Sequence, residues 1–174
     1  SPMQVSDAAK RCVQQIINTD IFQQSQHIAF YQAVKNELDP SAAIAIALQH
    51  QKTCYLPCLT NENQALNFLP LNAQTPLVEN QYGILEPQKK TNQKPFPTHA
   101  LDLVLVPLVA ADKQGNRLGM GKGYYDRTFV FAKKSAKATP HTKPHLMGLA
   151  YDFQVIENLT SDLWDIPLDS LLIG

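Results

Sequence analysis

Hydrophobic residues recur at helical spacing in the first part of the chain. From Pro2 to Ile17 the apolar positions follow three- and four-residue steps, which predicts an amphipathic helix with a solvated polar face. Asp39 and Pro40 predict the start of a second helix that runs to about His50, with Asp39 as its N-cap and Pro40 at its first position. A β-rich run from His27 to Val34 lies between the two helices.

Short apolar runs farther along the chain predict the strands of a sheet. They are Thr53 to Pro57, Ala65 to Leu69, Leu101 to Val106, Leu146 to Ala150 and Leu171 to Ile173. The run that ends at Val106 is continuously apolar apart from Asp102, which is typical of a buried strand in a parallel sheet. The stretch from Asn72 to His99 is rich in Pro, Asn, Gln and Lys and predicts a long loop, whereas Tyr124 to Lys134 has helical character.

This alternation of elements predicts an α/β fold. We expect a single domain over residues 1–174, with three α/β/α layers and a mostly parallel, Rossmann-like sheet. The chain is long enough for one domain to bury a core of ordinary size.

Charge and cysteine content exclude several kinds of partner. Lys and Arg number 15 and so do Asp and Glu, so no net field draws the chain to nucleic acid or to an anionic membrane. No apolar stretch approaches the roughly 20 residues that span a bilayer, and no secretory segment opens the sequence. The three cysteines lack zinc-site spacing, so we expect reduced, packed thiols in a cytoplasmic protein, with metal or redox chemistry as the alternative.

One glycine-punctuated segment carries the candidate chemistry. It reads Arg117-Leu118-Gly119-Met120-Gly121-Lys122-Gly123-Tyr124-Tyr125-Asp126-Arg127. Glycines let successive backbone N–H groups face one concavity that binds an anion. Lys122 and Arg117 suit phosphate oxygens, and Asp126 suits a magnesium ion, so the segment predicts a nucleoside triphosphate site. The alternative is a tight turn with solvated cations. The segment is neither a Walker loop nor a dinucleotide fingerprint, so it does not name a reaction.

A longer pattern adds a family resemblance. The run from Asp102 to Pro107, followed by Asp112, Gly115, Asn116 and residues 117–127, resembles the hallmark of the 5-formyltetrahydrofolate cyclo-ligase family. Supporting pieces follow in order at Tyr82 to Pro87, Gly148 to Tyr151 with Gln154, and Trp164 to Asp169. The resemblance covers essentially the full chain. It implies conversion of 5-formyltetrahydrofolate, with ATP and Mg²⁺, to 5,10-methenyltetrahydrofolate, ADP and phosphate.

The resemblance also implies residue roles. It places ATP at Arg117, Leu118, Gly119, Met120, Gly121, Lys122, Gly123, Tyr124 and Tyr125. It places the folate at Gln32, Glu37, Met120, Gly121, Lys122, Gly123 and Tyr124, and the magnesium ion at Asp126 and Asp165. Lys122, Arg117 and Tyr124 are the candidate catalytic residues. The alternatives are that Glu37 is a solvated charge beside the helix cap and that Asp165 lies in a surface turn.

Some features depart from the family pattern. Ser1-Pro2-Met3 aligns just after the family's basic N-terminal helix, so we expect that helix to be missing. Leu108 replaces a glycine, which predicts a changed loop shape, and Ala111 replaces a common Phe.

Two other function classes follow from these departures. One is a non-catalytic folate- or nucleotide-binding protein, and the other is a different phosphate-ligand enzyme on a related scaffold. Lys89, Lys90 and Lys94 are expected to face solvent, or alternatively a polyglutamate tail. We expect a monomer that binds small molecules.

Overall fold

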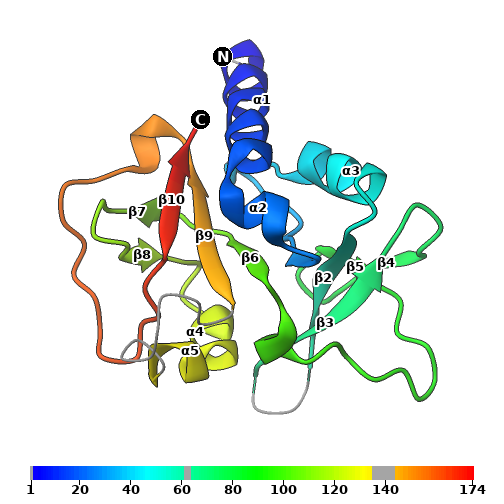
Figure 1. Cartoon of the computed structure of the whole chain (residues 1–174). Coiled ribbons are helices and arrows are strands. Elements are labelled where there is room, and N and C mark those ends of the chain that lie inside the picture. Colours follow the sequence, from blue (N-terminus) through cyan, green and yellow to red (C-terminus); the bar gives the residue numbers. More distant parts are fainter. Residues whose placement is uncertain (1, 61–63, 135–143) are drawn as a thin grey trace.

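A six-stranded sheet forms the centre of the molecule (Figure 1). This computed structural model describes residues 2–60, 64–134 and 144–174. The strand order is β10-β9-β6-β1-β2-β3. The strands are β1 (His27–Ala29), β2 (Thr53–Leu59), β3 (Leu66–Leu71), β6 (Leu103–Val106), β9 (His145–Ala150) and β10 (Ser170–Ile173). All neighbours pair in parallel except β3, which runs antiparallel to β2 at the edge, so the predicted α/β class is confirmed.

Three helices cover one face of the sheet. They are α1 (Pro2–Asn18), α2 (Asp20–Gln24) and α3 (Ser41–Gln49). Cys12 and Ile16 of α1 are fully buried in the same cluster as Leu103 and Leu105 of β6, so the first predicted helix is confirmed by its apolar stripe. In the described parts of the chain, no helix is long and apolar enough to cross a membrane.

The start of α3 differs from the prediction by one residue. Pro40 is the N-cap instead of the first helical residue, and the carboxylate of Asp39 accepts a hydrogen bond from the Ser41 N–H at 2.9 Å. Asp39 therefore lies one residue before the N-cap position, and its side chain binds the N–H of the first helical residue.

Two short helices cover the opposite face. Val104 and Val106 point to this side because successive side chains of a strand alternate. The helical character predicted from Tyr124 to Lys134 is confirmed, but the stretch is divided into two helices, α4 (Tyr124–Thr128) and α5 (Val130–Lys134). Phe129 separates them, and its ring is fully buried beside Phe68 of β3. The helix breaks where this ring enters the core.

The predicted long loop from Asn72 to His99 contains regular structure. An antiparallel hairpin joins β4 (Leu77–Glu79) to β5 (Leu85–Pro87), and a 3-10 turn (Thr98–Ala100) follows. The hairpin turn closes when Gly83, at φ +71°, donates its N–H to the Asn80 carbonyl. A second small ribbon pairs β7 (Ala110–Ala111) with β8 (Arg117–Leu118). Lys89, Lys90 and Lys94 are exposed, as expected.

The three cysteines lie in the core. All are free and buried, and burial raises the pKa of each thiol to about 12. The thiols therefore stay protonated at neutral pH, which favours packing over metal or redox chemistry.

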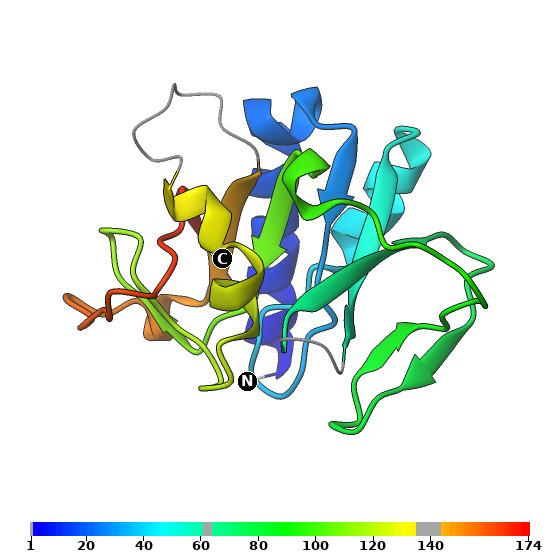
Figure 2. The same ribbon diagram turned by 90° about the horizontal axis from the view of Figure 1, so that it is seen from below.

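The connections of the sheet create a crevice. The chain leaves β1 and reaches β2 through α3 on one face, whereas it leaves β6 and reaches β9 through α4 and α5 on the other (Figure 2). Because β1 and β6 are parallel neighbours, the loops that follow them begin at the same edge of the sheet. The two loops then turn to opposite faces. Open α/β sheets bind ligands at such a switch point, outside the carboxyl ends of the strands.

Candidate active site

A cleft of about 1240 Å³ lies at this switch point. Residues 31–37, which follow β1, form one wall, and residues 117–127, which follow β6, form another. The β4–β5 hairpin and residues 160–165 complete the rim. The cleft brings together every residue to which the sequence assigned a role: Gln32, Glu37, Arg117, Leu118, Gly119, Met120, Gly121, Lys122, Gly123, Tyr124, Tyr125, Asp126 and Asp165.

The glycine loop, residues 117–127, owes its path to left-handed backbone. Gly121 has φ +83°, and Gly123, at φ +66°, is the N-cap of α4. An L side chain at either position would be strained. Lys122 lies between these two glycines and is exposed to the cleft. Thr128 fixes the far end of α4 by accepting the Leu66 N–H of β3 at 2.8 Å.

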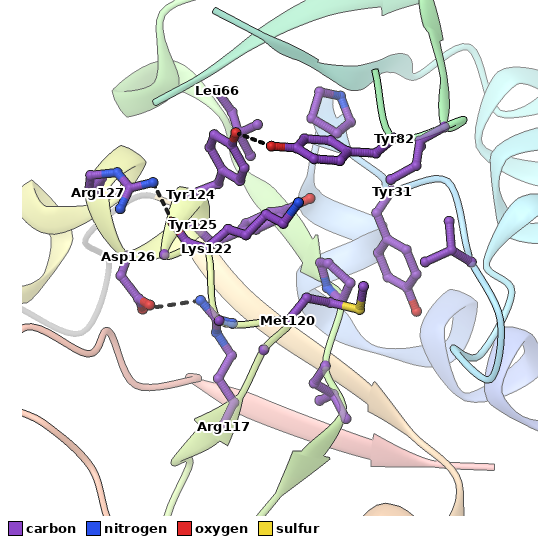
Figure 3. A pocket seen from close by; sticks show the side chains of 18 of the residues that line it. Tyr31, Leu66, Tyr82, Arg117, Met120, Lys122, Tyr124, Tyr125, Asp126 and Arg127 are labelled. Carbon is purple, nitrogen blue, oxygen red and sulfur yellow. Dashed lines mark hydrogen bonds and ion pairs between the residues drawn. The ribbon is translucent and has the colours of Figure 1, made fainter. Parts of the chain in front are cut away.

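Arg117 and Asp126 form an ion pair across the loop. Their closest atoms, Arg117 Nη2 and Asp126 Oδ1, are 3.1 Å apart, and the side chains are only 8% and 19% exposed (Figure 3). The guanidinium also lies over the Tyr125 ring, 5.7 Å from its centroid. Asp126 Oδ1 accepts a further hydrogen bond from the Ile166 N–H at 3.0 Å. These contacts fix both ends of the glycine loop.

A C-terminal arm, residues 152–168, carries Asp165 to the cleft. It is tied along the β7–β8 ribbon, since Ile156 donates its N–H to the Ala111 carbonyl and Leu168 donates to Gly115. Gly115 has φ +91°, and a Cβ there would lie 2.6 Å from the Leu168 carbonyl oxygen. Only glycine therefore permits this docking.

Asp165 ends a turn within that arm. Its Oδ2 accepts the Asp162 N–H at 2.7 Å, and Ile166, the next residue, binds Asp126. The predicted surface turn is therefore present, and it also lines the cleft beside the other predicted magnesium carboxylate. In residues 2–60, 64–134 and 144–174, no group of three or more His, Cys, Asp or Glu side chains could hold a metal ion alone.

Glu37 lies on the opposite wall and is half-buried. Its Oε2 accepts the Val34 N–H at 3.0 Å. Burial raises the pKa of Glu37, and the hydrogen bond from Val34 opposes that rise. Glu37 is therefore a cleft residue and does not act as a solvated charge beside the α3 cap.

The hairpin contributes Tyr82, which the sequence reasoning gave no role. The Lys122 Nζ lies 3.2 Å from the centroid of the Tyr82 ring, and the Tyr82 hydroxyl is 3.3 Å from the Tyr124 hydroxyl. Figure 3 shows Lys122 extending from the glycine loop beneath Tyr82. The signal available in the sequence was the Tyr82-Gly83 turn between two apolar pairs, which the Pro- and Asn-rich surroundings obscured.

Leu108 does not distort the loop after β6 in the way its replacement of a glycine suggested. It is absent from the positive-φ residues of the described chain, and its side chain is 2% exposed. The side chain packs over Gly148 of β9, and the Leu108 carbonyl accepts a hydrogen bond from Gln154 at 3.2 Å. The loop therefore runs with ordinary backbone angles and gains a core contact.

The fold and the cleft define the class of protein: an α/β enzyme whose glycine-rich, cation-bearing loop faces a second, carboxylate-bearing wall at a topological switch point. The model of the 5-formyltetrahydrofolate cyclo-ligase family matches residues 1–174, and the chain belongs to this family.

Named relatives agree with this family. The chain is 37% identical over 173 residues to the 5-formyltetrahydrofolate cyclo-ligase of Haemophilus influenzae, covering 99% of this chain and 88% of the relative. It is 36% identical over 146 residues to that of Escherichia coli K12, covering 83% and 76%.

Solved structures agree as well. The chain resembles the NMR structure of Aquifex aeolicus 5,10-methenyltetrahydrofolate synthetase with a TM-score of 0.79 and 30% identity, covering 99% and 81% of the two chains. The Mycoplasma pneumoniae 5,10-methenyltetrahydrofolate synthetase, at 23% identity and a TM-score of 0.71, shares the fold over 98% of this chain and 87% of its own.

Proposed function

We propose that this enzyme closes the ring of 5-formyltetrahydrofolate to give 5,10-methenyltetrahydrofolate, at the expense of ATP and with release of ADP and phosphate. The observation that carries the proposal is that one cleft has two different walls. The glycine loop with Lys122 forms one wall, and the other wall carries the half-buried carboxylate of Glu37. Its volume, about 1240 Å³, exceeds that of a typical single-ligand pocket, so two substrates fit together.

The reaction needs a leaving group where a formamide has none. The formyl oxygen attacks the γ-phosphorus of ATP, an O–P bond forms, and the bond from that phosphorus to ADP breaks. N10 then adds to the activated formyl carbon and loses its proton, and the C–O bond breaks as phosphate departs. Phosphoryl transfer of this kind depends mainly on positioning and charge neutralisation, so no covalent nucleophile is required.

The loop supplies that positioning. Lys122 neutralises charge on the transferred phosphoryl group, and the N–H groups between Gly119 and Gly123 face the phosphates. Arg117 shapes the loop through its ion pair with Asp126, and it also lines the cleft in which the phosphates bind. Tyr124 packs against the folate, while Glu37 accepts hydrogen bonds from the amino and ring N–H groups of the pterin.

Asp126 and Asp165 suit a magnesium ion. Both hydrogen bonds found for the Asp126 carboxylate in the described chain end on Oδ1, which leaves Oδ2 for a cation. Two carboxylates are too few for a protein-only site, but they match the preference of Mg²⁺ for one or two carboxylates, water and substrate phosphates. When bound, the ion neutralises phosphate charge.

The test follows methenyl product formation by absorbance after 5-formyltetrahydrofolate, MgATP and enzyme are mixed. We expect turnover in the native chain and a fall in kcat of about 10²–10³ in Lys122→Ala, the scale for removing one charge-stabilising donor. Lys94→Ala is the matched control, because Lys94 is exposed outside the cleft.

Two outcomes would reject parts of this proposal. Tight folate binding without product would favour a non-catalytic binding protein. Native kinetics in Lys122→Ala would remove Lys122 from the catalytic residues.

A further inference from the structure

The catalytic lysine is held by a residue from a distant part of the chain. Lys122 extends from the glycine loop, and its ammonium lies 3.2 Å from the centroid of the Tyr82 ring on the β4–β5 hairpin (Figure 3). The Tyr82 hydroxyl is 3.3 Å from the hydroxyl of Tyr124, the residue that begins α4. The hairpin therefore contacts the glycine loop at Lys122 and at Tyr124, where α4 begins.

The hairpin is anchored firmly enough to serve as a support. Glu86 Oε2 accepts the Leu59 N–H of β2 and the Asn80 side-chain amide, both at 3.1 Å. Asn80 Oδ1 in turn accepts the Tyr82 N–H at 2.9 Å and the Ile84 N–H at 3.2 Å. A continuous set of hydrogen bonds thus joins the sheet to the turn that presents Tyr82.

Lys122 needs such a support because its neighbours in the chain restrict the conformation of its side chain very little. Its neighbours Gly121 and Gly123 both have positive φ, and its four-carbon side chain is exposed. Holding a lysine side chain in one conformation costs rotamer entropy. An ammonium over an aromatic face is attracted by the ring, and the attraction is stronger where water is excluded.

We propose that Tyr82 is a positioning residue that holds the Lys122 ammonium inside the cleft in readiness for the transferred phosphate. This inference rests on the proposed function, because it assigns Lys122 to the phosphoryl group. The aromatic ring supplies the hold, and the hydroxyl bond to Tyr124 sets the orientation of the ring. Tyr82 acts through Lys122 and makes no contact of its own with the reacting atoms.

A kinetic double-mutant cycle tests the inference, because coupled residues are not additive. Tyr82→Leu removes the ring, and we expect kcat with saturating folate to fall about 3- to 30-fold, the range of one cation–π contact. Tyr82→Phe keeps the ring, so it recovers most of that loss. In the Lys122→Ala background, Tyr82→Leu has no further effect beyond about twofold.

Val78→Ala is the matched control. Val78 lies on the same hairpin, is 40% exposed and does not line the cleft, so native kinetics are expected. Circular dichroism and the unfolding midpoint of each variant show whether the hairpin variants fold.

The possible failures are distinguishable. If Tyr82→Leu lowers kcat by the same factor with and without Lys122, the residues act independently and the inference is wrong. If Tyr82→Leu raises only the KM for folate, Tyr82 contacts the substrate directly, which also overturns it. If Lys122→Ala alone has native kinetics, the proposed role of Lys122 fails first, and this inference fails with it.

Discussion

Glu37 shows how the fold changes the chemistry of a single side chain. In the sequence it stands two residues before Asp39 and reads as an exposed charge near a helix cap. In the structure it lines the cleft, and burial raises the pKa of its carboxyl above the ordinary value of 4.5. The backbone N–H of Val34 holds Oε2 at 3.0 Å and partly opposes this rise.

The raised pKa gives a prediction for folate binding. Only the ionised carboxylate accepts two hydrogen bonds from the pterin, so the KM for 5-formyltetrahydrofolate rises as the pH falls through the pKa of Glu37. Glu37→Gln raises the KM by about 10- to 100-fold, because its amide group faces a donor, and it removes this pH dependence. Steady-state kinetics across the acidic range measure both effects.

Glu157→Gln is the control for that experiment. Glu157 is exposed and lies away from the cleft, so this variant keeps both the native KM and the native pH profile. An unchanged pH profile in Glu37→Gln would show that another group controls folate binding.

The ion pair between Arg117 and Asp126 could not be predicted from the residue types alone. Their residue types predicted an anion- and metal-binding segment in which the two act as separate ligands. Their ion pair joins positions nine residues apart and depends on β8 and α4 meeting at one corner. No periodicity in the sequence encodes that meeting, because Gly121 and Gly123 redirect the backbone between them.

Elements with a strong apolar pattern were predictable, and elements held by tertiary contacts were not. Helix α1 and strands β6 and β9 carry complete apolar signals and match the predictions. The hairpin strands β4 and β5 have three residues each, and all three residues of β4 lie at the surface. Their stability comes from Glu86 and Asn80, whose polar side chains suggest a loop when seen in sequence alone.

Asp112 organises the loop between β7 and β8 and its contact with the C-terminal arm. Its carboxylate accepts the N–H groups of Gln114, Asn116 and Leu159 and the Asn116 side-chain amide, at 2.9–3.0 Å. Burial raises the pKa of Asp112, but these four hydrogen bonds outweigh it and the net pKa is lowered. The loop that carries Arg117 therefore depends on an ionised Asp112.

Asp112→Asn is expected to destabilise the fold by about 2–3 kcal/mol at neutral pH, because an amide group replaces an oxygen that accepts charge-assisted hydrogen bonds. A depressed folded-state pKa contributes stability above the unfolded value of 3.8, and this contribution is lost as the pH falls through the folded pKa. The difference between the variant and the native chain therefore shrinks below about pH 3.8.

Urea unfolding at several pH values measures this difference. Asp152→Asn, at an exposed position of the same arm, is the control and unfolds as the native chain does. A constant difference down to the lowest pH at which the fold survives would show that the Asp112 charge is unimportant.

At the scale of the whole molecule, the site follows from the order of the strands. The sequence predicted a mostly parallel sheet but not that β1 pairs with β6, with Ile28 opposite Leu103. That pairing creates the switch point and brings residues 31–37 against residues 117–127. Apolar strands of similar composition do not specify their neighbours. The residue types alone indicated the wall at residues 117–127, whereas only the family resemblance indicated the wall that carries Gln32 and Glu37.

Trp164 offers a direct test of this assembly. It is the only tryptophan in the sequence, its side chain is 67% exposed, and it lines the cleft on the arm that docks against α4 through Ile166 and Asp126. A nucleotide seated at the glycine loop changes the solvent around an indole at this position. A hydrolysis-resistant ATP analogue with Mg²⁺ should therefore change Trp164 emission saturably, with a midpoint close to its inhibition constant. Trp164→Phe removes the signal. If the analogue inhibits catalysis fully while the emission stays unchanged, the nucleotide does not reach the rim formed by the arm, and the two walls are used separately.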